Sequence, residues 1–327
     1  MQYHTSVLLK ESVDALDVSD QGVYVDVTFG GGGHSKEILS RSQRCSLFSF
    51  DQDEDALENE LEDDRFTLIH SNFSDLENSL KLYRVHEVDG ILADLGVSSH
   101  QFDAEERGFS IRFDGPLDMR MGKGVGKTAA DIISGYSWEE IAAVIRSYSD
   151  LKGAGRIARR IKDVHSSSPI KRTGELVEVI RKLAPPNKHN KFLAQVFQAL
   201  RIEVNNEMQV LKDMLSQTLN VLKPGGVLVV ISYHSIEDRL VKNFFKSGNI
   251  DGVSSKRIYS IKNLIKKNNI KYVFLDGSNL GKISRKLQNK DIRIITFCHN
   301  VETNFFLKKL KTQFNLKNLY ILISNFL

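Results

Sequence analysis

The sequence of 327 residues contains only two cysteines, Cys45 and Cys298. Two cysteines cannot build the disulfide framework of a small secreted domain, and such scarcity is typical of a reducing compartment. No apolar run approaches the roughly 20 residues that a membrane-spanning helix needs. The first residues lack a basic segment followed by an apolar one, so no secretory signal is visible. We therefore expect a cytoplasmic protein without a membrane partner.

The chain also lacks an even distribution of charge. Its formal net charge is +4, but residues 251–327 alone hold 15 Lys and Arg against 4 Asp and Glu, a net charge of +11. The remaining residues therefore carry a net charge of −7. The basic character of the protein belongs mostly to its last quarter, which differs in composition from the rest of the chain.

One stretch, residues 23–35, joins an alternating β-branched run to four consecutive glycines, Gly30 to Gly33. A strand, a glycine turn and a helix form the opening of a nucleotide-binding α/β unit. Glycines are needed there because the turn takes positive φ angles and the backbone approaches the ligand closely. A tight turn in any α/β protein could carry the same glycines, so this signal alone is weak.

A second strand, expected over residues 45–50, ends at Asp51, which follows Gly33 by 18 positions. A carboxylate at about this spacing meets the ribose hydroxyls of a bound adenosine. The spacing leaves both NAD and S-adenosylmethionine open. Residues 30–35 favour S-adenosylmethionine in part, because they lack the third glycine of the dinucleotide fingerprint. Asp26, at the end of the first strand, could hold a methionine amino group where a dinucleotide would place its pyrophosphate.

Further strands are expected over residues 66–70 and 88–95, with an acidic helix over 53–61. Four strands separated by helical segments predict an α/β fold with a parallel, doubly wound sheet and right-handed crossovers. Ligands bind such sheets at the carboxyl ends of the strands. The residues that follow the four strands, and that we expect to line one crevice, are Gly30 to His34, Asp51, Phe73 and Asp94.

The strand–helix alternation stops after His100 and returns with a strand over residues 225–232. The helices expected after this point cover residues 138–148, 154–164, 173–183, 192–222 and 236–245. A chain of this length exceeds one ordinary domain. The predicted parts are the first part of the core, 1–100, a helical insertion, 101–190, the second part of the core, 191–250, and a basic α/β tail, 251–327.

Asp94 ends the fourth strand, where a reacting group would lie. A carboxylate there can accept a hydrogen bond from an amine, including the exocyclic N4 of cytosine. The lone pair of such an amine conjugates with the ring, so a nearby acceptor would raise its electron density and remove its proton late. Methyl transfer from a sulfonium is an in-line displacement, for which positioning is the main task. Asp94 could also serve only to hold the cofactor or to cap the following turn.

His234 follows the strand over 225–232 and is the second catalytic candidate beside Asp94. A histidine at this point could shuttle protons. It could equally satisfy a backbone carbonyl at the end of the strand. No cluster of Cys and His residues has the spacing of metal ligands, so the sequence implies no metal.

The insertion carries a basic surface. Between Leu151 and Lys191, 11 Lys and Arg residues stand against 3 Asp and Glu. A surface that contacts phosphates has such a composition, and its affinity for nucleic acid falls with salt. A solvated helix face is the alternative. The candidate RNA-binding residues are Arg156, Arg159, Arg160, Lys171 and Arg172.

Long motifs spread over about residues 1–250 together resemble the bacterial family of ribosomal RNA small-subunit methyltransferases H. These motifs cover residues 4–11, 26–35, 94–99, 107–110, 114–121, 197–205 and 231–239, and Gln101. The resemblance implies a class I S-adenosylmethionine-dependent methyltransferase fold, Rossmann-like, with a helical insertion for substrate recognition. It also implies methylation of N4 of a cytosine in the decoding region of 16S rRNA, so the partner would be 16S rRNA or the small ribosomal subunit. The cofactor residues that it implies are Gly32, Gly33, His34, Asp51, Phe73, Asp94 and Gln101.

The tail departs from this family, whose members end soon after the motif at 231–239 with a Pro- and Arg-rich segment and a last strand. Strand–turn–helix units are instead expected to begin at Lys271 and Asp291, and residues 297–306 loosely resemble part of some bacterial glycosyltransferases. A sheet without its last strands would have an exposed edge. Two other functions therefore stay open, an RNA-binding relic impaired by its altered C-terminus and a methyltransferase for another nucleic acid. The oligomeric state, a homodimer included, is not given by the sequence.

Overall fold

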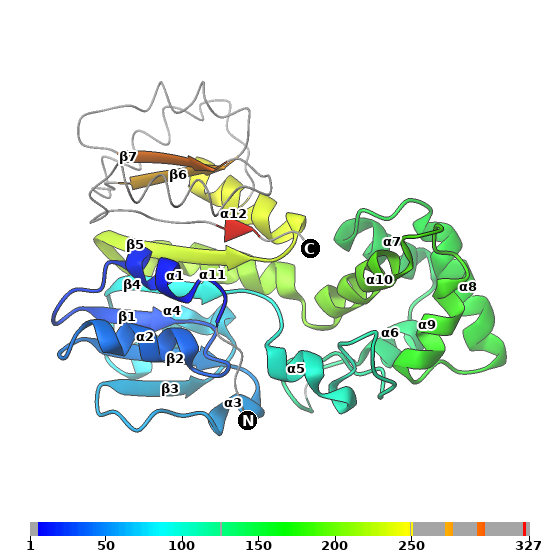
Figure 1. Ribbon diagram of the computed structural model, residues 1–327, viewed down its shortest axis with the longest axis horizontal. Helices are drawn as coiled ribbons and strands as arrows, with labels where there is room; N and C mark the ends of the chain where they lie inside the picture. Colours follow the sequence, from blue (N-terminus) through cyan, green and yellow to red (C-terminus); the bar gives the residue numbers. More distant parts are fainter. Residues whose placement is uncertain are drawn as a thin grey trace. The chain divides into compact units, whose positions relative to one another are not determined.

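The computed structural model divides the chain into two compact units (Figure 1). The first consists of Met1–Gly96 and Val210–Leu327, and the second of Val97–Gln209. The structure describes residues 6–124, 126–248 and 250, and three short strands within residues 272–276, 293–297 and 323–324. Among these described residues, none of the helices is both long and apolar enough to cross a lipid bilayer.

The first unit is built on a sheet in which every pair of neighbouring strands is parallel. Its strands, in sheet order, are β3 (Phe66–His70), β2 (Ser46–Asp51), β1 (Val23–Asp26), β4 (Val88–Asp94), β5 (Leu222–Ser232) and β8 (Ile323–Ser324). The order reverses between β1 and β4, and open α/β sheets bind ligands at the carboxyl ends of such a pair. The predicted α/β fold with a parallel sheet is thus confirmed.

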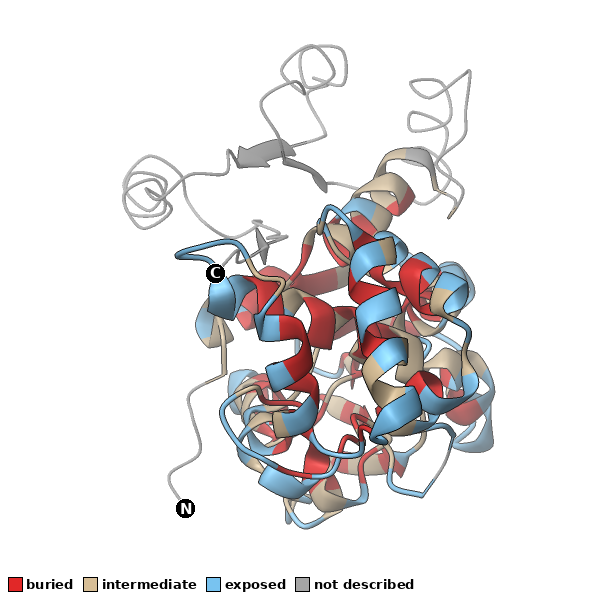
Figure 2. Ribbon diagram, turned by 90° about the vertical axis from the view of Figure 1, so that its right-hand side faces the viewer, coloured by how far each residue is buried: buried red, intermediate tan, exposed pale blue. Residues whose placement is uncertain are grey.

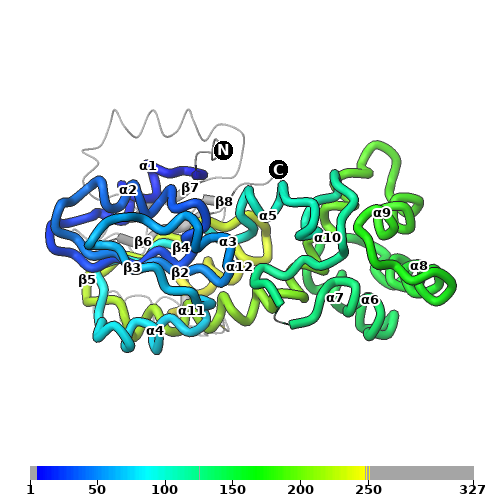
Figure 3. The backbone as a smooth tube through the Cα atoms, turned by 90° about the horizontal axis from the view of Figure 1, so that it is seen from below, coloured from blue at the N-terminus to red at the C-terminus, as the bar shows by residue number. Residues whose placement is uncertain are grey.

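Helices cover both faces of this sheet. They are α1 (Leu9–Leu16), α2 (Gly33–Arg41), α3 (Glu54–Leu57), α4 (Leu76–Leu82), α11 (Glu207–Val221, which begins in the second unit) and α12 (Ser235–Ser247), with the 3₁₀ turn η1 (Phe73–Asp75). Figure 3 shows α1 and α2 on one face and α4 and α11 on the other. Strands covered on both faces are apolar almost throughout, and Leu47, Ile91 and Leu92 are accordingly fully buried.

The second unit is helical. It contains α5 (Ser99–Asp103), η2 (Glu105–Arg107), α6 (Ala129–Gly135), α7 (Trp138–Tyr148), α8 (Ala154–Ser167), α9 (Thr173–Arg181) and α10 (His189–Val204). The apolar side chains of these helices form one core, and Figure 2 shows their buried faces. In α8 the buried residues Ala154, Ile157, Ala158 and Ile161 recur at helical spacing, so the helix presents its basic residues on the other face.

The loop between η2 and α6 is held from inside the second unit. The guanidinium of Arg107, which is 5% exposed, donates to the carbonyl oxygens of Arg120 and Met121 at 3.1 and 2.8 Å. Asn205 donates from Nδ2 to the Met119 carbonyl, and its Oδ1 accepts from the Met121 amide, both at 2.7 Å. The backbone of Met119 has a φ of 65°, a value that residues other than glycine rarely adopt. The hydrogen bonds from Asn205 therefore maintain a strained turn.

Replacing Asn205 with alanine is expected to lower the free energy of unfolding of the helical unit by about 2 kcal/mol, since two loop groups lose their partner. The chain has a single tryptophan, Trp138 in α7, whose fluorescence in a urea titration reports on this unit. Asn190→Ala, an exposed position of α10, is the control and is expected to change stability by less than about 0.5 kcal/mol. Equal midpoints for the two variants would contradict the role of Asn205.

Two predicted helices differ from the structure. The helix expected over 53–61 is shortened to α3, because Asn59 turns back to donate to the Gly30 carbonyl at 3.1 Å. The helix expected over 192–222 is two helices, α10 and α11, separated at Asn206, which has a φ of 49°. Asparagine tolerates this left-handed conformation better than most residues. Helix α6 was not predicted, although the capping box of Thr128 and Asp131 marks its start.

The tail contributes three described strands. β6 (Tyr272–Asp276) and β7 (Arg293–Phe297) agree with the strands expected to begin at Lys271 and Asp291, and they pair in parallel as a separate sheet. The helices expected after them, Cys298 and the glycosyltransferase-like stretch beyond Phe297 lie outside the described residues. β8 pairs with β5 at Ile231 and Ser232, so the prediction of an open sheet edge is wrong at these two residues.

Candidate cofactor and catalytic site

The glycine loop connects β1 to α2 in a conformation that only small residues permit. Gly30 and Gly32 have φ angles of 52° and 75°, in the left-handed region. A Cβ at Gly32 would also lie 3.0 Å from the Phe29 ring, and one at Gly33 would overlap the side chain of Ser6. Helix α2 begins at Gly33, within the glycine run, so His34 lies in its first turn. Glycine is therefore required here by the positive φ angles at Gly30 and Gly32 and by the close packing of Phe29 and Ser6 against the loop.

Asp26, the last residue of β1, stabilises this loop through hydrogen bonds to Thr28 and Ser35 on either side of the glycines. Its side chain is fully buried, and one oxygen accepts from the amide and hydroxyl of Thr28 at 3.1 and 3.3 Å. The other oxygen accepts from the Ser35 hydroxyl at 2.7 Å. The Thr28 hydroxyl in turn accepts from the amide of Asp94 at 2.7 Å. Since Asp26 has no exposed surface, it holds the loop and the end of β4 together, and the suggestion that it meets a methionine amino group directly is not supported.

Asp51 joins the end of β2 to the glycine loop. Its two oxygens accept from the amides of Gly30 and Asp53, at 2.8 and 2.9 Å. Burial raises the pKa of Asp51 to about 6; the charges of Asp53 and Asp26 add to this, and the two amide donors oppose it. Each oxygen keeps a second lone pair, so the carboxylate can still accept from two ligand hydroxyls.

Phe73 follows β3 at the same edge of the sheet. It is the first residue of η1 and is half-buried. The amide of Ser71, two residues earlier, donates to the carbonyl oxygen of Asp51 at 2.9 Å. Asn72 donates to the Gln52 side chain at 2.6 Å, so the turn that carries Phe73 is tied to the end of β2.

Asp94 ends β4 with its carboxylate between two aromatic side chains. The Tyr233 hydroxyl donates to Oδ1 at 2.7 Å, and Nδ1 of His34 lies 3.8 Å from Oδ2. The Asp94 side chain keeps 20% of its surface exposed. Burial raises its pKa to about 6, an effect that the charges of Asp26 and Glu237 increase and that His34 and the Tyr233 hydrogen bond oppose.

His34 is oriented by the segment before α1. Its side chain is almost fully buried, and Nε2 lies 3.2 Å from the carbonyl oxygen of Val7. A carbonyl only accepts, so Nε2 carries a proton and Nδ1 is the nitrogen directed at Asp94. The structure thus brings together five of the predicted site regions in the first unit: the glycines Gly32 and Gly33, then His34, Asp51, Phe73 and Asp94.

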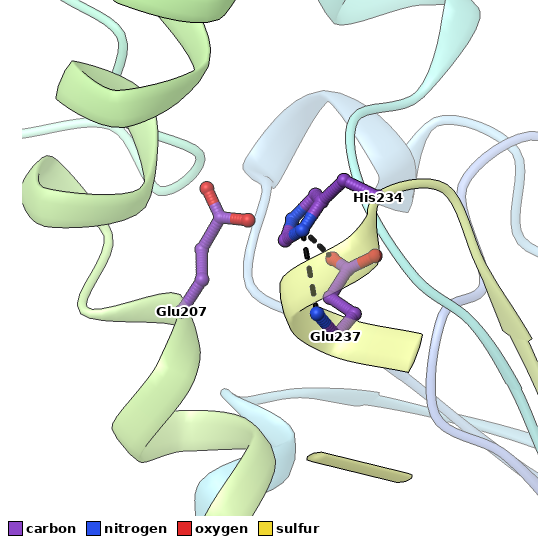
Figure 4. Close-up of side chains that lie close together, drawn as sticks. All are labelled: Glu207, His234 and Glu237. Atoms are coloured by element: carbon purple, nitrogen blue, oxygen red, sulfur yellow. Dashed lines mark hydrogen bonds and ion pairs between the residues drawn. The ribbon is translucent and has the colours of Figure 1, made fainter. Parts of the chain in front are cut away.

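His234 caps the start of α12 (Figure 4). Its Nδ1 accepts from the amide of Glu237 at 3.3 Å, and Nε2 lies 3.1 Å from Glu237 Oε1. His234 is 6% exposed and Glu237 2%. Glu207, drawn in the same figure, belongs to the second unit, where Arg201 donates to both of its carboxylate oxygens at 2.8 and 2.9 Å. His234 thus caps α12 by accepting from a backbone amide, which differs from the expected alternative of a backbone carbonyl partner, and among the described residues its buried Nε2 has no hydrogen bond.

Tyr233 is the site residue that the sequence analysis missed. It follows β5 directly and precedes His234, so it stood inside a motif that had already been singled out. No signal in the sequence alone identified it, because the pairing of β5 with β4 comes from the tertiary structure. A tyrosine at the carboxyl end of β5 must then lie beside the carboxylate at the end of β4.

Gln101 belongs to the second unit and is described within it. It is 5% exposed and forms a capping box with Ser98 at the start of α5. Its Nε2 lies 3.4 Å from the carbonyl oxygen of Met121, the same oxygen that accepts from Arg107. Gln101 therefore connects α5 to the loop that Asn205 holds.

The predicted RNA-binding residues differ in their contacts. Arg156, Arg159 and Arg160 are all exposed on α8, and the guanidinium of Arg159 lies 3.9 Å above the ring of Trp138. Lys171 is exposed, whereas Arg172 donates from Nε to a carboxylate oxygen of Asp114 at 2.8 Å. A partnered guanidinium offers less to a phosphate, so α8 is the stronger part of the predicted surface.

The parallel sheet with its glycine loop, and the aspartates that end β2 and β4, define a class I methyltransferase fold. The model of the MraW methylase family matches residues 1–271. The chain belongs to this family of S-adenosylmethionine-dependent methyltransferases. The match extends about twenty residues into the tail, beyond the limit of about 250 expected from the motifs.

Relatives named ribosomal RNA small subunit methyltransferase H are similar to most of the chain. The protein of Flavobacterium johnsoniae is 50% identical over 295 residues, 90% of this chain and 97% of its own length. The protein of Christiangramia forsetii is 53% identical over 260 residues, which are 79% of this chain and 86% of its own length. The protein of Bacteroides fragilis strain YCH46 is 54% identical over 258 residues, which are 79% of this chain and 85% of its own length.

Solved structures are less similar. An rRNA methylase of Streptococcus thermophilus is 20% identical with a TM-score of 0.23, over 29% of this chain and 57% of its own. A methyltransferase of Streptococcus mutans in complex with SAH is 19% identical with a TM-score of 0.21, over 30% and 57% of the two chains. Scores this low carry no argument about the site.

Proposed function

We propose that this protein methylates the exocyclic N4 of a cytosine in the decoding region of 16S rRNA, with S-adenosylmethionine as the methyl donor. The observation that carries this proposal is a row of three aspartates. Asp51, Asp26 and Asp94 end β2, β1 and β4, which are adjacent in the sheet.

The row of aspartates selects for the charge of the ligand. Burial and the neighbouring carboxylates raise the pKa of Asp51 and of Asp94 to about 6, so bringing in further negative charge would be unfavourable. The pyrophosphate of a dinucleotide carries two negative charges, whereas S-adenosylmethionine carries a net positive charge, since its sulfonium and ammonium groups outnumber its one carboxylate. The site therefore fits the second ligand, which relieves the repulsion that the first would increase.

The residues of the first unit divide the work of binding. Gly30 and Gly32 give the loop its left-handed turn beside Asp51, and Asp51 has lone pairs for the two ribose hydroxyls. Gly32 and Gly33 stay candidates for cofactor contact on the resemblance. Phe73 begins η1 on the turn that is tied to the end of β2 beside Asp51, so its backbone or ring would meet the adenine. His34 and Asp94 lie at the other end, beside the reacting group. Gln101, in the second unit, stays a candidate for cofactor contact on the resemblance alone.

Asp94 is the residue that we assign to the chemistry. When bound, S-adenosylmethionine supplies a methyl group on a positively charged sulfur. Oδ2 of Asp94 accepts a hydrogen bond from the N4 amine, which raises the electron density on nitrogen. It takes the amine proton as the nitrogen–methyl bond forms and the sulfur–methyl bond breaks, which leaves the neutral thioether S-adenosylhomocysteine. A carboxylate with a pKa of about 6 is ionised at neutral pH and is a better proton acceptor than an ordinary aspartate. His234 is assigned to holding α12.

The proposed substrate rests on the relatives and on the helical unit. Relatives at 50 to 54% identity carry a name that specifies small-subunit ribosomal RNA. The exposed arginines of α8 supply a cationic surface of the kind that RNA phosphates require. Asp94 supports an exocyclic amine as the acceptor, because a carboxylate accepts from an amine and would repel a carbonyl oxygen. The choice of N4 of cytosine among such amines rests on the resemblance to the methyltransferase H family.

Methyl incorporation tests this function. The purified full chain is incubated with methyl-labelled S-adenosylmethionine and with small ribosomal subunits, naked 16S rRNA, DNA or no acceptor. We expect label in the ribosomal samples, recovered as N4-methylcytidine after digestion to nucleosides. Label in DNA alone would establish the alternative of another nucleic acid. Absence of label, together with retained RNA binding, would establish the impaired RNA-binding protein.

Reversing two charges on α8 is expected to weaken RNA binding. The variant Arg156→Glu/Arg160→Glu removes two exposed cations one helical turn apart. We expect the slope of log K against log salt to become shallower by about 1 to 2, with affinity about tenfold or more lower near 0.1 M salt. Filter binding to 16S rRNA fragments over a salt series measures both quantities. Lys10→Glu, an exposed position of α1, is the control for charge, and equal slopes in the two variants would favour a merely solvated face.

A further inference from the structure

We propose that Tyr233 is a positioning residue for this reaction, whose hydroxyl holds one carboxylate oxygen of Asp94 so that the other is presented to the acceptor amine. The inference rests on the proposed function, which makes Asp94 the group that contacts the amine. It goes beyond that function because it assigns a residue whose effect passes through Asp94 alone.

Three contacts fix Tyr233. Its hydroxyl donates to Oδ1 of Asp94 at 2.7 Å. Its amide donates to Oε2 of Glu237 at 3.0 Å, and Glu237 is almost fully buried at the start of α12. Its ring lies over Gly96, where a Cβ would approach the ring to 3.5 Å. The phenol is therefore held at its backbone, its ring and its hydroxyl, so its hydroxyl has a defined direction.

The strand pairing explains why Tyr233 reaches Asp94. β4 and β5 are parallel neighbours with Asp94 opposite Ile231, and the Leu95 amide donates to the Ile231 carbonyl at 3.0 Å. Tyr233 follows two residues after Ile231, on the turn that leads into α12. The hydroxyl and the carboxylate thus come from adjacent strands in a fixed register, and a rigid placement of this kind is what a reacting group needs.

The hydrogen bond acts on the protonation of Asp94. A phenol donor stabilises the ionised carboxylate and occupies Oδ1, which leaves Oδ2 as the acceptor. The groups that face Asp94 are His34 from α2, Asp26 from β1, Glu237 from α12 and Tyr233 itself. Burial and the nearby carboxylates raise the pKa of Tyr233, so it stays a donor at neutral and mildly alkaline pH. Of these groups, His34 and Tyr233 favour the charged form of Asp94, whereas Asp26 and Glu237 oppose it.

The variant Tyr233→Phe tests the proposal, because it keeps the ring and removes only the hydroxyl. We expect kcat for methyl transfer to fall about tenfold at pH 6 and to recover to within about twofold at pH 8.5, where Asp94 is ionised in any case. The acid limb of the pH profile therefore moves to higher pH, and KM for S-adenosylmethionine changes little. Loss of activity that is equal at every pH would indicate a packing role and would overturn the proposal, as would an unchanged profile.

Tyr136→Phe is the matched control. Tyr136 donates to a carboxylate oxygen of Glu203 at 2.9 Å within the second unit, so this variant also removes a bond between a phenol and a carboxylate. We expect its pH profile to coincide with that of the wild type. A shift as large as that of Tyr233→Phe would show that the effect is not specific to Asp94 and would overturn the proposal.

Unfolding of the apo chain gives a readout that does not depend on activity. The raised pKa of Asp94 means that the folded state loses stability as pH rises from about 4 through 6. Without the Tyr233 hydroxyl this decline should extend to higher pH, and in the background Asp94→Asn the effect of Tyr233→Phe should not depend on pH. A pH-independent effect in both backgrounds would overturn the link between the two residues. An inactive wild type that keeps this link would instead refute the proposed function.

Discussion

Replacing Asp94 with alanine is expected to lower kcat for methyl transfer by at least about 10³-fold at pH 7.5. The variant removes the acceptor that raises the electron density of the amine and takes its proton, and general-base and orienting effects together reach this size. The fold should survive, because burial disfavours the ionised carboxylate, whose pKa is raised to about 6. The free energy of unfolding at pH 7.5 is therefore expected to stay equal or to rise.

Asp89 supplies the matched control for this result. It lies on the same strand at the opposite end, where its Oδ2 accepts from the Val23 amide at 2.8 Å and from Lys223 Nζ at 2.7 Å. Asp89→Ala should cost stability while kcat stays within about twofold of the wild type. Single-turnover methyl transfer separates the chemical step from product release. A kcat for Asp94→Ala within about tenfold of the wild type would remove Asp94 from the chemistry.

The affinity for S-adenosylhomocysteine, the demethylated cofactor, is expected to depend on pH through Asp51. Its pKa of about 6 in the free protein means that the carboxylate is ionised above pH 7 and protonated below pH 5. The ribose hydroxyls donate to the ionised form, so binding below pH 6 must first displace a proton. Affinity should therefore be constant above pH 7 and should fall about tenfold between pH 6 and pH 5.

Asp51→Asn is expected to weaken this binding about 10- to 100-fold at pH 7.5 and to reduce its pH dependence, because one of the two groups with a pKa near 6 no longer titrates. Titration calorimetry at several pH values measures both effects, and heat changes in buffers of different ionisation enthalpy count the protons released. Asp63→Asn, whose carboxylate pairs with Arg65, is the control. The same pH slope in Asp51→Asn and in the wild type would exclude Asp51 from the ribose site.

Much of the site followed from the sequence because parallel strands share a direction. The carboxyl ends of β1, β2, β3 and β4 must meet at one edge of the sheet, so Gly32, Asp51, Phe73 and Asp94 could be assembled from their positions alone. The glycine run, whose loop has positive φ angles at Gly30 and Gly32, could be recognised for the same reason. These are local properties, which periodicity and residue type determine without knowledge of distant contacts.

The order of the strands in the sheet could not be predicted from the sequence. The hydrogen-bond partner of Asp94, which depends on that order, could therefore not be predicted either. Tyr233 is 139 positions away along the chain, and only the pairing of β4 with β5 brings the two together. The same limit applied to Asp26, since a buried carboxylate that is satisfied by Thr28 and Ser35 looks in sequence like one that awaits a ligand. It applied also to His234, whose ring is directed at Glu237 of its own helix.

The sequence by itself thus determined the class of the first unit, the edge of the sheet at which the candidate site lies, and four of the charged or aromatic groups at it, His34, Asp51, Phe73 and Asp94. Tertiary structure decided which polar groups are already satisfied and which still face a ligand, because hydrogen bonding depends on direction and distance between residues far apart in the chain. Tertiary structure also divided the single helix expected over 192–222 into α10 and α11 at Asn206, whose positive φ overrides helical periodicity. It also supplied β8, a strand of the tail that pairs with β5 and that no local pattern had assigned to the sheet.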